Sequence, residues 1–242
     1  MGREWAKSCR VSVVAFVLAV MAVSATGQSL PVEGKVLAEI SGYRISLFDI
    51  QSGEEDTILI KDEVVSHYAR MREPTFSPDG KRIAFVLQDG VNPTICRIYV
   101  ADNNGANIEH LCDFTNHDAQ ALSWCTNGYI YWCENTDAIY RVNVLTRGKE
   151  TYWDRPGING YGDETKVEDM VVSNDGTRAS ARGGGEVSVL NLADKYLMSY
   201  GRGGCSGWIS PDGDRVAHPY TCCVPFPDGA SSYTQVTAIE SI

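Results

Sequence analysis

The stretch Pro74–Phe85, PTFSPDGKRIAF, decides the expected fold, because its centre Ser-Pro-Asp-Gly returns in Trp208–Ala217, WISPDGDRVA. Proline fixes φ at the first central position of a tight turn, aspartate tolerates the second position, and glycine accepts the strained exit. Looser copies, Cys-Thr-Asn-Gly and Ser-Asn-Asp-Gly, end at Gly128 and Gly176. Counted from Gly80 to Gly213, the four turn glycines lie 48, 48 and 37 residues apart. The turn therefore marks a repeated unit.

Short strand-like stretches recur after each turn in the same order. The second strands are KRIAFVL, YIYWC, TRASA and DRVAH; the third strands are Arg97–Asp102, Ala138–Asn143 and Glu186–Asn191; the fourth strands are Asn107–Cys112 and Glu150–Trp153. Four short antiparallel strands in each repeat of this length predict a blade of a β-propeller. An all-β sandwich also has short strands, but it does not account for turns, second strands and third strands that all recur in register.

The repeat resembles the blade of TolB-like propellers. The resemblance rests on apolar-Ser-Pro-Asp-Gly-Lys-Arg-Ile-Ala-Phe followed by Ile-Tyr-Val-x-Asp-x-x-Gly, and it covers roughly Val36 to Ala217. It is strongest in Pro74–Cys112 and weakest around Val172–Tyr200. It implies an extracytoplasmic all-β propeller in which the first strand of each blade lines a central channel.

The chain holds four to five such blades. Their expected extents are 33–70, 71–117, 118–165, 166–204 and 205–242. Val36–Ile60 supplies three strands and lacks the first strand of its blade, while the last blade has a hairpin at Ser206–His218 and one strand at Tyr233–Ile239. Closed propellers commonly have more blades than this. The count therefore favours an incomplete ring, with an irregularly closed five-bladed ring as the alternative.

The first 27 residues have the composition of a secretory signal peptide. A basic start, MGREWAKSCR, precedes the apolar run Val11–Val23 and the small residues SATGQ, and cleavage is expected after Ala25 or Gly27. The alternative is an uncleaved anchor, but this run is shorter than the roughly 20 residues that span a bilayer. The sequence therefore predicts a secreted or periplasmic protein that is not inserted in the membrane after cleavage.

The charge of the chain argues against one class of partner. The sequence has 21 basic and 31 acidic residues, a net charge of -10, and it contains no run rich in lysine or arginine. An acidic surface repels phosphate backbones, so nucleic acid is excluded as an expected partner.

Seven cysteines remain beyond the signal segment, and an oxidising compartment favours disulfides between them. Cys96 and Cys112 flank the turn at Asn103–Gly105 nearly symmetrically. Cys205 can meet Cys222 or Cys223 across the last hairpin. These pairings are hypotheses, because spacing alone does not fix them.

No catalytic, metal-binding or cofactor-binding set emerges from the sequence. His110 and Cys112 are predicted to share one strand face, but two ligands do not make a zinc site. His218 lies at the end of a second strand, which is a place for a channel histidine. Gly203–Gly207, GGCSG, is followed by a strand rather than by the helix that a nucleophile elbow needs. Asp102–Gly105 lacks the spacing of a calcium loop.

One long connection is a candidate contact loop. The run Trp153–Thr165 carries Trp153, Arg155 and Tyr161 on a glycine-rich segment between blades, where binding residues often lie; a plain connector is the alternative. The leading hypothesis is therefore a non-catalytic binding scaffold, most simply for a protein. The competing hypothesis is the propeller portion of an extracytoplasmic enzyme, either a serine peptidase or an oligosaccharide lyase.

Overall fold

The structure is a computed structural model of the chain. It describes residues 35–40, 42–60, 68–92, 94–115, 120–134, 138–154, 156, 167–183, 186–203, 207–225 and 231–241. The predicted signal peptide lies outside these ranges. All regular elements in them are strands, and none of them is a helix long and apolar enough to cross a membrane.

The strands form five antiparallel sheets of three, four, four, four and three strands. The first sheet holds β1 (Lys35–Ile40), β2 (Arg44–Asp49) and β3 (Glu55–Ile60). The second holds β4 (Tyr68–Phe76), β5 (Arg82–Asp89), β6 (Ile95–Asp102) and β7 (Glu109–Thr115). The third holds β8 (Gln120–Trp124), β9 (Tyr129–Cys133), β10 (Ala138–Asn143) and β11 (Lys149–Asp154).

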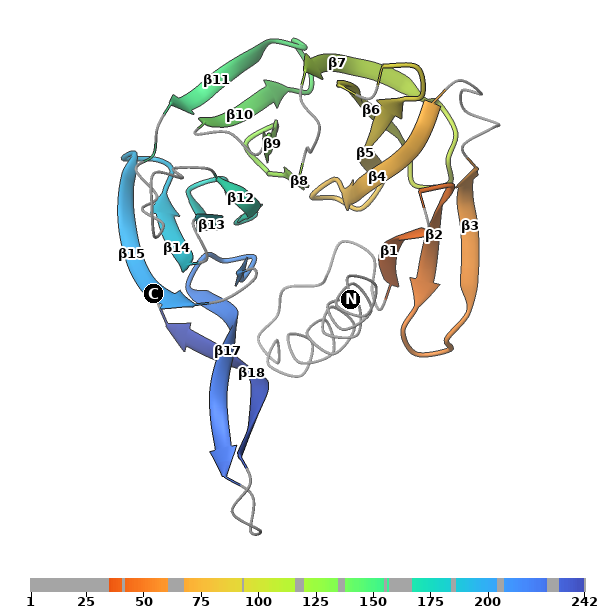
Figure 1. Cartoon of the computed structure of the whole chain (residues 1–242). Helices are drawn as coiled ribbons and strands as arrows, with labels where there is room; N and C mark the ends of the chain where they lie inside the picture. The colour runs from red at the N-terminus through yellow and green to blue at the C-terminus, as the bar shows by residue number, and fades with distance from the viewer. Residues whose placement is uncertain are drawn as a thin grey trace.

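The fourth sheet holds β12 (Glu168–Val172), β13 (Arg178–Gly183), β14 (Glu186–Asn191) and β15 (Tyr196–Gly203). The fifth holds β16 (Trp208–Ile209), β17 (Arg215–Pro225) and β18 (Ser231–Ser241), so the strand predicted at Tyr233–Ile239 pairs with a long β17. The five sheets stand side by side around an axis, with β4, β8 and β12 nearest to it (Figure 1). The predicted blade arrangement is confirmed, and a two-layer sandwich is excluded.

Each core cluster lies between two neighbouring sheets. Ile83, Phe85 and Leu87 of β5 pack toward the first sheet, and Ala84 and Val86 of the same strand pack toward the third sheet. Because both faces of a middle strand are buried, its sequence is continuously apolar instead of alternating. The largest buried side chain, Trp132, fills the space between the second and third sheets.

The first sheet lacks an inner strand among the described residues. The amide of Met71, near the start of β4, donates to the carbonyl of Gly42 in the β1–β2 turn. In the second sheet the β5–β6 connection lies at that same end, because Tyr68 pairs with Asp89. The strands β1, β2 and β3 therefore correspond to the second, third and fourth strands of a full sheet. Among the described strands, each sheet contacts the next from the first to the fifth, whereas the fifth and first sheets stand apart, so the described ring is incomplete (Figure 1).

Candidate functional site

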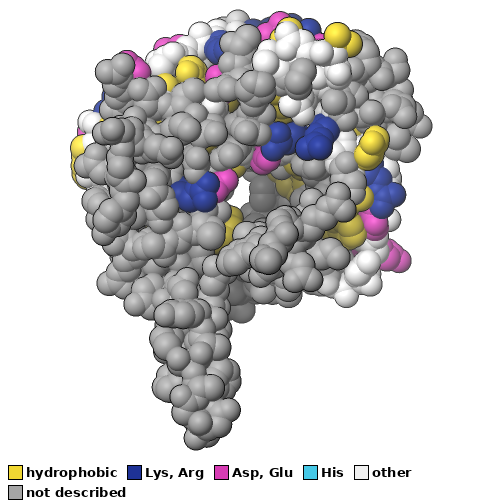
Figure 2. Space-filling model, viewed as in Figure 1, with side chains coloured by type: hydrophobic (Ala, Val, Ile, Leu, Met, Phe, Trp, Pro, Cys, Tyr) yellow, Lys and Arg dark blue, Asp and Glu magenta, His cyan; other side chains and the backbone are white. Residues whose placement is uncertain are grey.

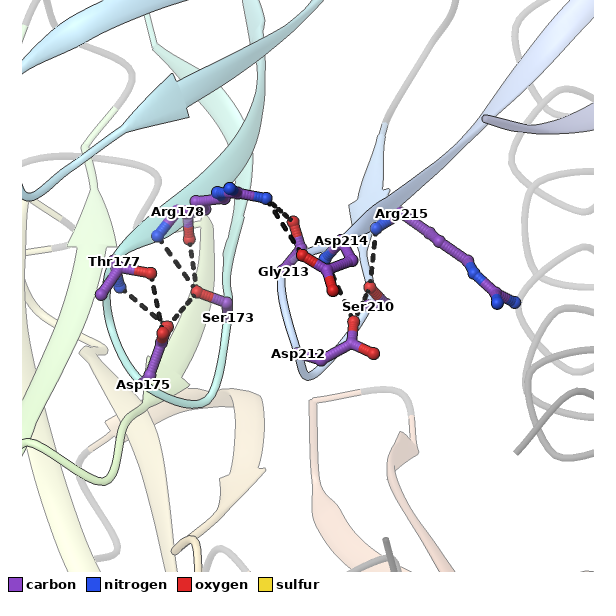
Figure 3. A network of polar contacts seen from close by, with 9 residues as sticks. All are labelled: Ser173, Asp175, Thr177, Arg178, Ser210, Asp212, Gly213, Asp214 and Arg215. Atoms are coloured by element: carbon purple, nitrogen blue, oxygen red, sulfur yellow. Dashed lines mark hydrogen bonds and ion pairs between the residues drawn. The ribbon is translucent and has the colours of Figure 1, made fainter. Parts of the chain in front are cut away.

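The repeated turns form one end of the sheets, which we call the turn face: residues 77–82, 125–129, 173–178 and 210–215. In three turns the serine hydroxyl donates to the aspartate two residues on, and it accepts the amide of an arginine five residues on. The aspartate also accepts the amide two residues after itself. Figure 3 shows two of these turns side by side. The repeated Ser and Asp thus hold the turn backbone rigid.

Neighbouring turns are also bonded to one another. The amide of Thr126 donates to the carbonyl of Asn174 over 2.6 Å, and the amide of Asn174 donates to the carbonyl of Pro211 over 2.9 Å. Arg178 reaches from the fourth sheet to the fifth, where its Nη1 lies 2.9 Å from the carbonyl of Gly213 and 3.2 Å from the carboxylate of Asp214 (Figure 3). The turn face of the last three sheets is therefore one connected surface.

The hydrogen bonds of the turns lower the pKa of their aspartates. The hydroxyls of Ser77 and Ser210 have the largest effect on Asp79 and Asp212, followed by backbone amides. At Asp175, partial burial acts in the opposite direction, but the bonds from Ser173 and Thr177 outweigh it, so the pKa of Asp175 is also lowered.

Acid is therefore expected to weaken the turn face. A carboxylate with a lowered folded-state pKa stabilises the fold above its unfolded pKa, about 3.9, and this contribution is lost as the pH falls through the folded-state value. The melting temperature of Asp79→Asn and Asp212→Asn variants should fall less between pH 5 and pH 3 than that of the unsubstituted protein, as followed by circular dichroism. Asp56→Asn, outside the turns, is the control. A profile unchanged by the turn substitutions would contradict this prediction.

The turn of the third sheet, at residues 125–129, departs from the repeat. The amide of Cys125 donates to the carbonyl of Tyr129, four residues on, whereas the amide of Ser77 donates to Arg82, five residues on. This turn is thus one residue shorter than the turn after Ser77. An alignment of the repeats on the turn glycine is therefore wrong by one position for the residues after Gly128. Tyr129 consequently pairs with Asn143 as Arg82 pairs with Asp102.

Beside this turn lies a tyrosine–arginine cluster: Tyr129, Tyr131, Arg141, Glu150, Tyr152 and Lys195. The guanidinium carbon of Arg141 lies 4.1 Å from the ring centre of Tyr129 and 4.0 Å from that of Tyr152. Its Nε donates to Glu150 over 2.7 Å, and its Nη1 donates to the Tyr131 hydroxyl over 3.3 Å. These contacts fix the plane of the guanidinium.

The cluster joins the third sheet to the fourth. The Tyr152 hydroxyl donates to the carbonyl of Leu192 over 2.6 Å, and the Lys195 ammonium lies 4.8 Å from the centre of the Tyr152 ring. Burial raises the pKa of Tyr152, so this phenol is neutral at pH 7. Burial opposes the charge of Arg141, but its bonds to Tyr131 and Glu150 outweigh burial and raise its pKa.

Sequence reasoning missed this cluster, although a signal was present. Arg141 lies two residues before the end of β10. The residues at the same place in β6 and β14 are Val100 and Val189, which are both buried. An arginine at a repeated apolar position is a local break in the pattern, and such breaks are expected at functional sites.

The inner strands form a second feature, at the centre of the molecule. Glu73, Ala121 and Asp169 all have positive φ, at 51, 52 and 47°, and each lies beside a register irregularity in β4, β8 or β12. They are 48 residues apart, like the turns. The Glu73 carboxylate accepts the Ala121 amide of the next sheet over 3.1 Å. Bulges of this kind are common next to binding sites.

Charged side chains lie beside this feature. Figure 2 shows Lys, Arg, Asp and Glu side chains near an opening in the middle of the molecule. Arg70, Arg72 and Glu73 lie on β4, and Asp169 of β12 forms an ion pair of 3.5 Å with Arg182 of β13. The described residues include no group of three or more His, Cys, Asp or Glu placed to hold a metal ion.

The predicted contact loop is described only in part. Trp153 lies in β11 opposite Ile139 and is half-buried against the core between the third and fourth sheets. Arg155 and Tyr161 lie outside the described residues. The structure thus assigns Trp153 a packing contact and leaves the loop a prediction.

The histidine and cysteine predicted to share a face do not. His110 pairs with Tyr99 and Cys112 pairs with the adjacent Ile98, so Leu111 forms a bulge and the two side chains lie on opposite faces. His110 is exposed and contacts Asp113 at 2.8 Å, whereas burial raises the pKa of Cys112 to about 12. The side chain of His218 is outside the described set.

The structure holds Cys96 and Cys112 as separate buried thiols. Cys96 lies opposite Phe114 and Cys112 opposite Ile98, so the two cysteines are diagonal neighbours. Diagonal positions are about 7–8 Å apart, which is beyond the usual span of a disulfide. Cys205 and the side chains of Cys222 and Cys223 lie outside the described residues.

Comparison with known proteins identifies the architecture. No family model matches the chain, and no curated protein matches it. A TolB structure from Acinetobacter baumannii superposes with a TM-score of 0.57 at 18% identity, over 86% of this chain and 51% of that one. A putative TolB from Agrobacterium tumefaciens gives 0.58 at 13% identity, over 88% and 78%. The fold is that of a TolB-like β-propeller.

The same propeller fold occurs in enzymes. An oligogalacturonate lyase in complex with manganese matches with a TM-score of 0.58 at 10% identity, over 85% of this chain and 63% of that one. The chain spans only about half to two thirds of the Acinetobacter TolB and of this lyase. At these identities the likeness establishes the TolB-like propeller fold alone.

Proposed function

We propose that this protein is an extracytoplasmic, non-catalytic binding scaffold that recognises a protein partner on its turn face. The observation that carries the proposal is the bonding of that face. Repeated Ser and Asp side chains fix each turn, and hydrogen bonds through Thr126, Asn174 and Arg178 connect the turns of three sheets. A surface that is already rigid loses little conformational entropy on binding.

Two further observations support the proposal. The signal-like composition of residues 1–27 would place the propeller outside the cytoplasm. The TolB structures are similar in fold. In the described turns, the carboxylate oxygens of the repeated aspartates accept hydrogen bonds from backbone amides and hydroxyls. These aspartates therefore have a structural role rather than that of a general acid or base.

Site-specific crosslinking tests this function. A photoreactive amino acid replaces Lys81 or Thr126, which are both exposed on the turn face, in the full chain. Irradiation in an extract of the extracytoplasmic fraction of the source cells should give the same discrete protein adduct from both positions. Val91, 88% exposed in the β5–β6 connection at the opposite end of the sheets, is the matched control and should give no such adduct. Equal adducts from all three positions, or none, would refute the proposal.

A further inference from the structure

The tyrosine–arginine cluster has an unused guanidinium edge. The Nε of Arg141 donates to Glu150, and its Nη1 donates to the Tyr131 hydroxyl. Its Nη2 has no hydrogen-bond acceptor among the described residues. One fifth of the side chain remains exposed. The rings of Tyr129 and Tyr152 hold the guanidinium between them, so its orientation is fixed before any ligand binds.

A second cation lies at the edge of the same cluster. Lys195 of the fourth sheet is exposed, lies over the Tyr152 ring, and forms no ion pair with any described residue. Tyr152 thus contacts one cation from its own sheet and one from the next. Two acidic residues lie close by, but each is engaged: Glu150 accepts from Arg141, and Asp194 accepts from Asn191 over 3.2 Å.

A fixed guanidinium edge, an exposed ammonium and tyrosine rings together suit one ligand chemistry. Arginine binds carboxylates through planar hydrogen bonds, and tyrosine and arginine are the residues that dominate protein interfaces. We propose that the tyrosine–arginine cluster, where the third sheet meets the fourth, binds a carboxylate side chain of an acidic peptide segment, with Arg141 and Lys195 as its contacts. The inference rests on the proposed scaffold function. It adds that the segment of the partner that contacts Arg141 and Lys195 is acidic.

The charge of the whole protein makes the test selective. A chain with a net charge of -10 repels an anionic peptide, so binding must come from a local site. The probe is fluorescein-labelled hexaglutamate, followed by anisotropy at low and at physiological salt, with hexaglutamine of the same length as the neutral comparison. Hexaglutamate should bind and lose affinity with salt, and hexaglutamine should not bind.

Three substitutions separate a built site from diffuse attraction. Lys195→Gln should weaken hexaglutamate binding about tenfold, the size of one charge-assisted contact. Arg141→Lys keeps the charge but removes the planar edge, and it should weaken binding at least as much, with its melting temperature recorded as a check on folding. Lys35→Gln, at an exposed lysine of the first sheet that is outside the turn face, gives the same change in net charge and should alter the affinity less than twofold.

Equal losses for Lys195→Gln and Lys35→Gln, or no binding of hexaglutamate at low salt, would overturn the carboxylate site. Its failure is distinguishable from failure of the scaffold function. If the Lys195→Gln protein still gives the crosslinked adduct at Lys81 and Thr126 in undiminished yield, the scaffold function stands and this cluster is not part of it.

Discussion

Replacing Gly105 with alanine is expected to lower the free energy of unfolding by at least about 3 kcal/mol, because two costs coincide there. Gly105 has a φ of +83°, a conformation that costs an alanine roughly 1 kcal/mol. A Cβ at this position would also overlap the backbone carbonyl oxygen of Ile58 in β3. Backbone cannot rotate away as a side chain can, so the second sheet would have to move from the first.

Gly53 is the matched control for this prediction. Its φ of +73° is similar, but a Cβ there would meet no atom within 4 Å. Gly53→Ala should therefore cost only about 1 kcal/mol. Urea denaturation followed by circular dichroism measures both values. Equal losses for the two variants would show that the approach of the β6–β7 turn to β3 is not as close as the structure has it.

Removing the Trp132 side chain is expected to cost about 3–5 kcal/mol, the range for a fully buried large aromatic residue. Its ring is 0% exposed and lies 5.9 Å from the rings of both Phe114 and Tyr140. Trp132→Ala would leave a cavity between the second and third sheets. It would also remove the 2.8 Å hydrogen bond that the indole of Trp132 donates to the buried carboxyl of Glu134. Burial raises the pKa of Glu134, and this bond partly offsets that rise.

Trp153→Ala is the comparison for this loss. Trp153 is half-buried on an outermost strand and packs only at the margin of a core cluster, so its loss should be about 1–2 kcal/mol. Unfolding of both variants by urea, monitored by circular dichroism, gives the difference. A loss at Trp153 as large as that at Trp132 would contradict the placement of the main inter-sheet contact.

The sequence predicted the sheets well where its repeat is regular. The turns at Gly80, Gly176 and Gly213 and the strands behind them lie as expected, because turn chemistry and apolar strands are local properties of the chain. The turn of the third sheet was placed one residue out of register beyond Gly128, because a one-residue deletion leaves the letters of the turn nearly unchanged. The hydrogen bond from Cys125 to Tyr129 and the pairing of Tyr129 with Asn143 reveal it.

The prediction that His110 and Cys112 share a face failed for a related reason. Alternation along a strand holds only while the pairing is regular, and the bulge at Leu111 reverses it. The pairing of neighbouring strands decides whether a bulge forms, and one strand read alone does not contain that information. The bulges at Glu73, Ala121 and Asp169 escaped the sequence analysis in the same way.

The sequence by itself determined that this protein is built of repeated, four-stranded antiparallel units, because a similar turn followed by a short strand recurs every 37 to 48 residues. The tertiary structure alone decided which side chains meet between those units. Arg141, Tyr152 and Lys195 come from two different sheets, and they meet because the third sheet packs against the fourth. Contacts between sheets depend on how whole faces fit together, and no spacing along the chain encodes that fit.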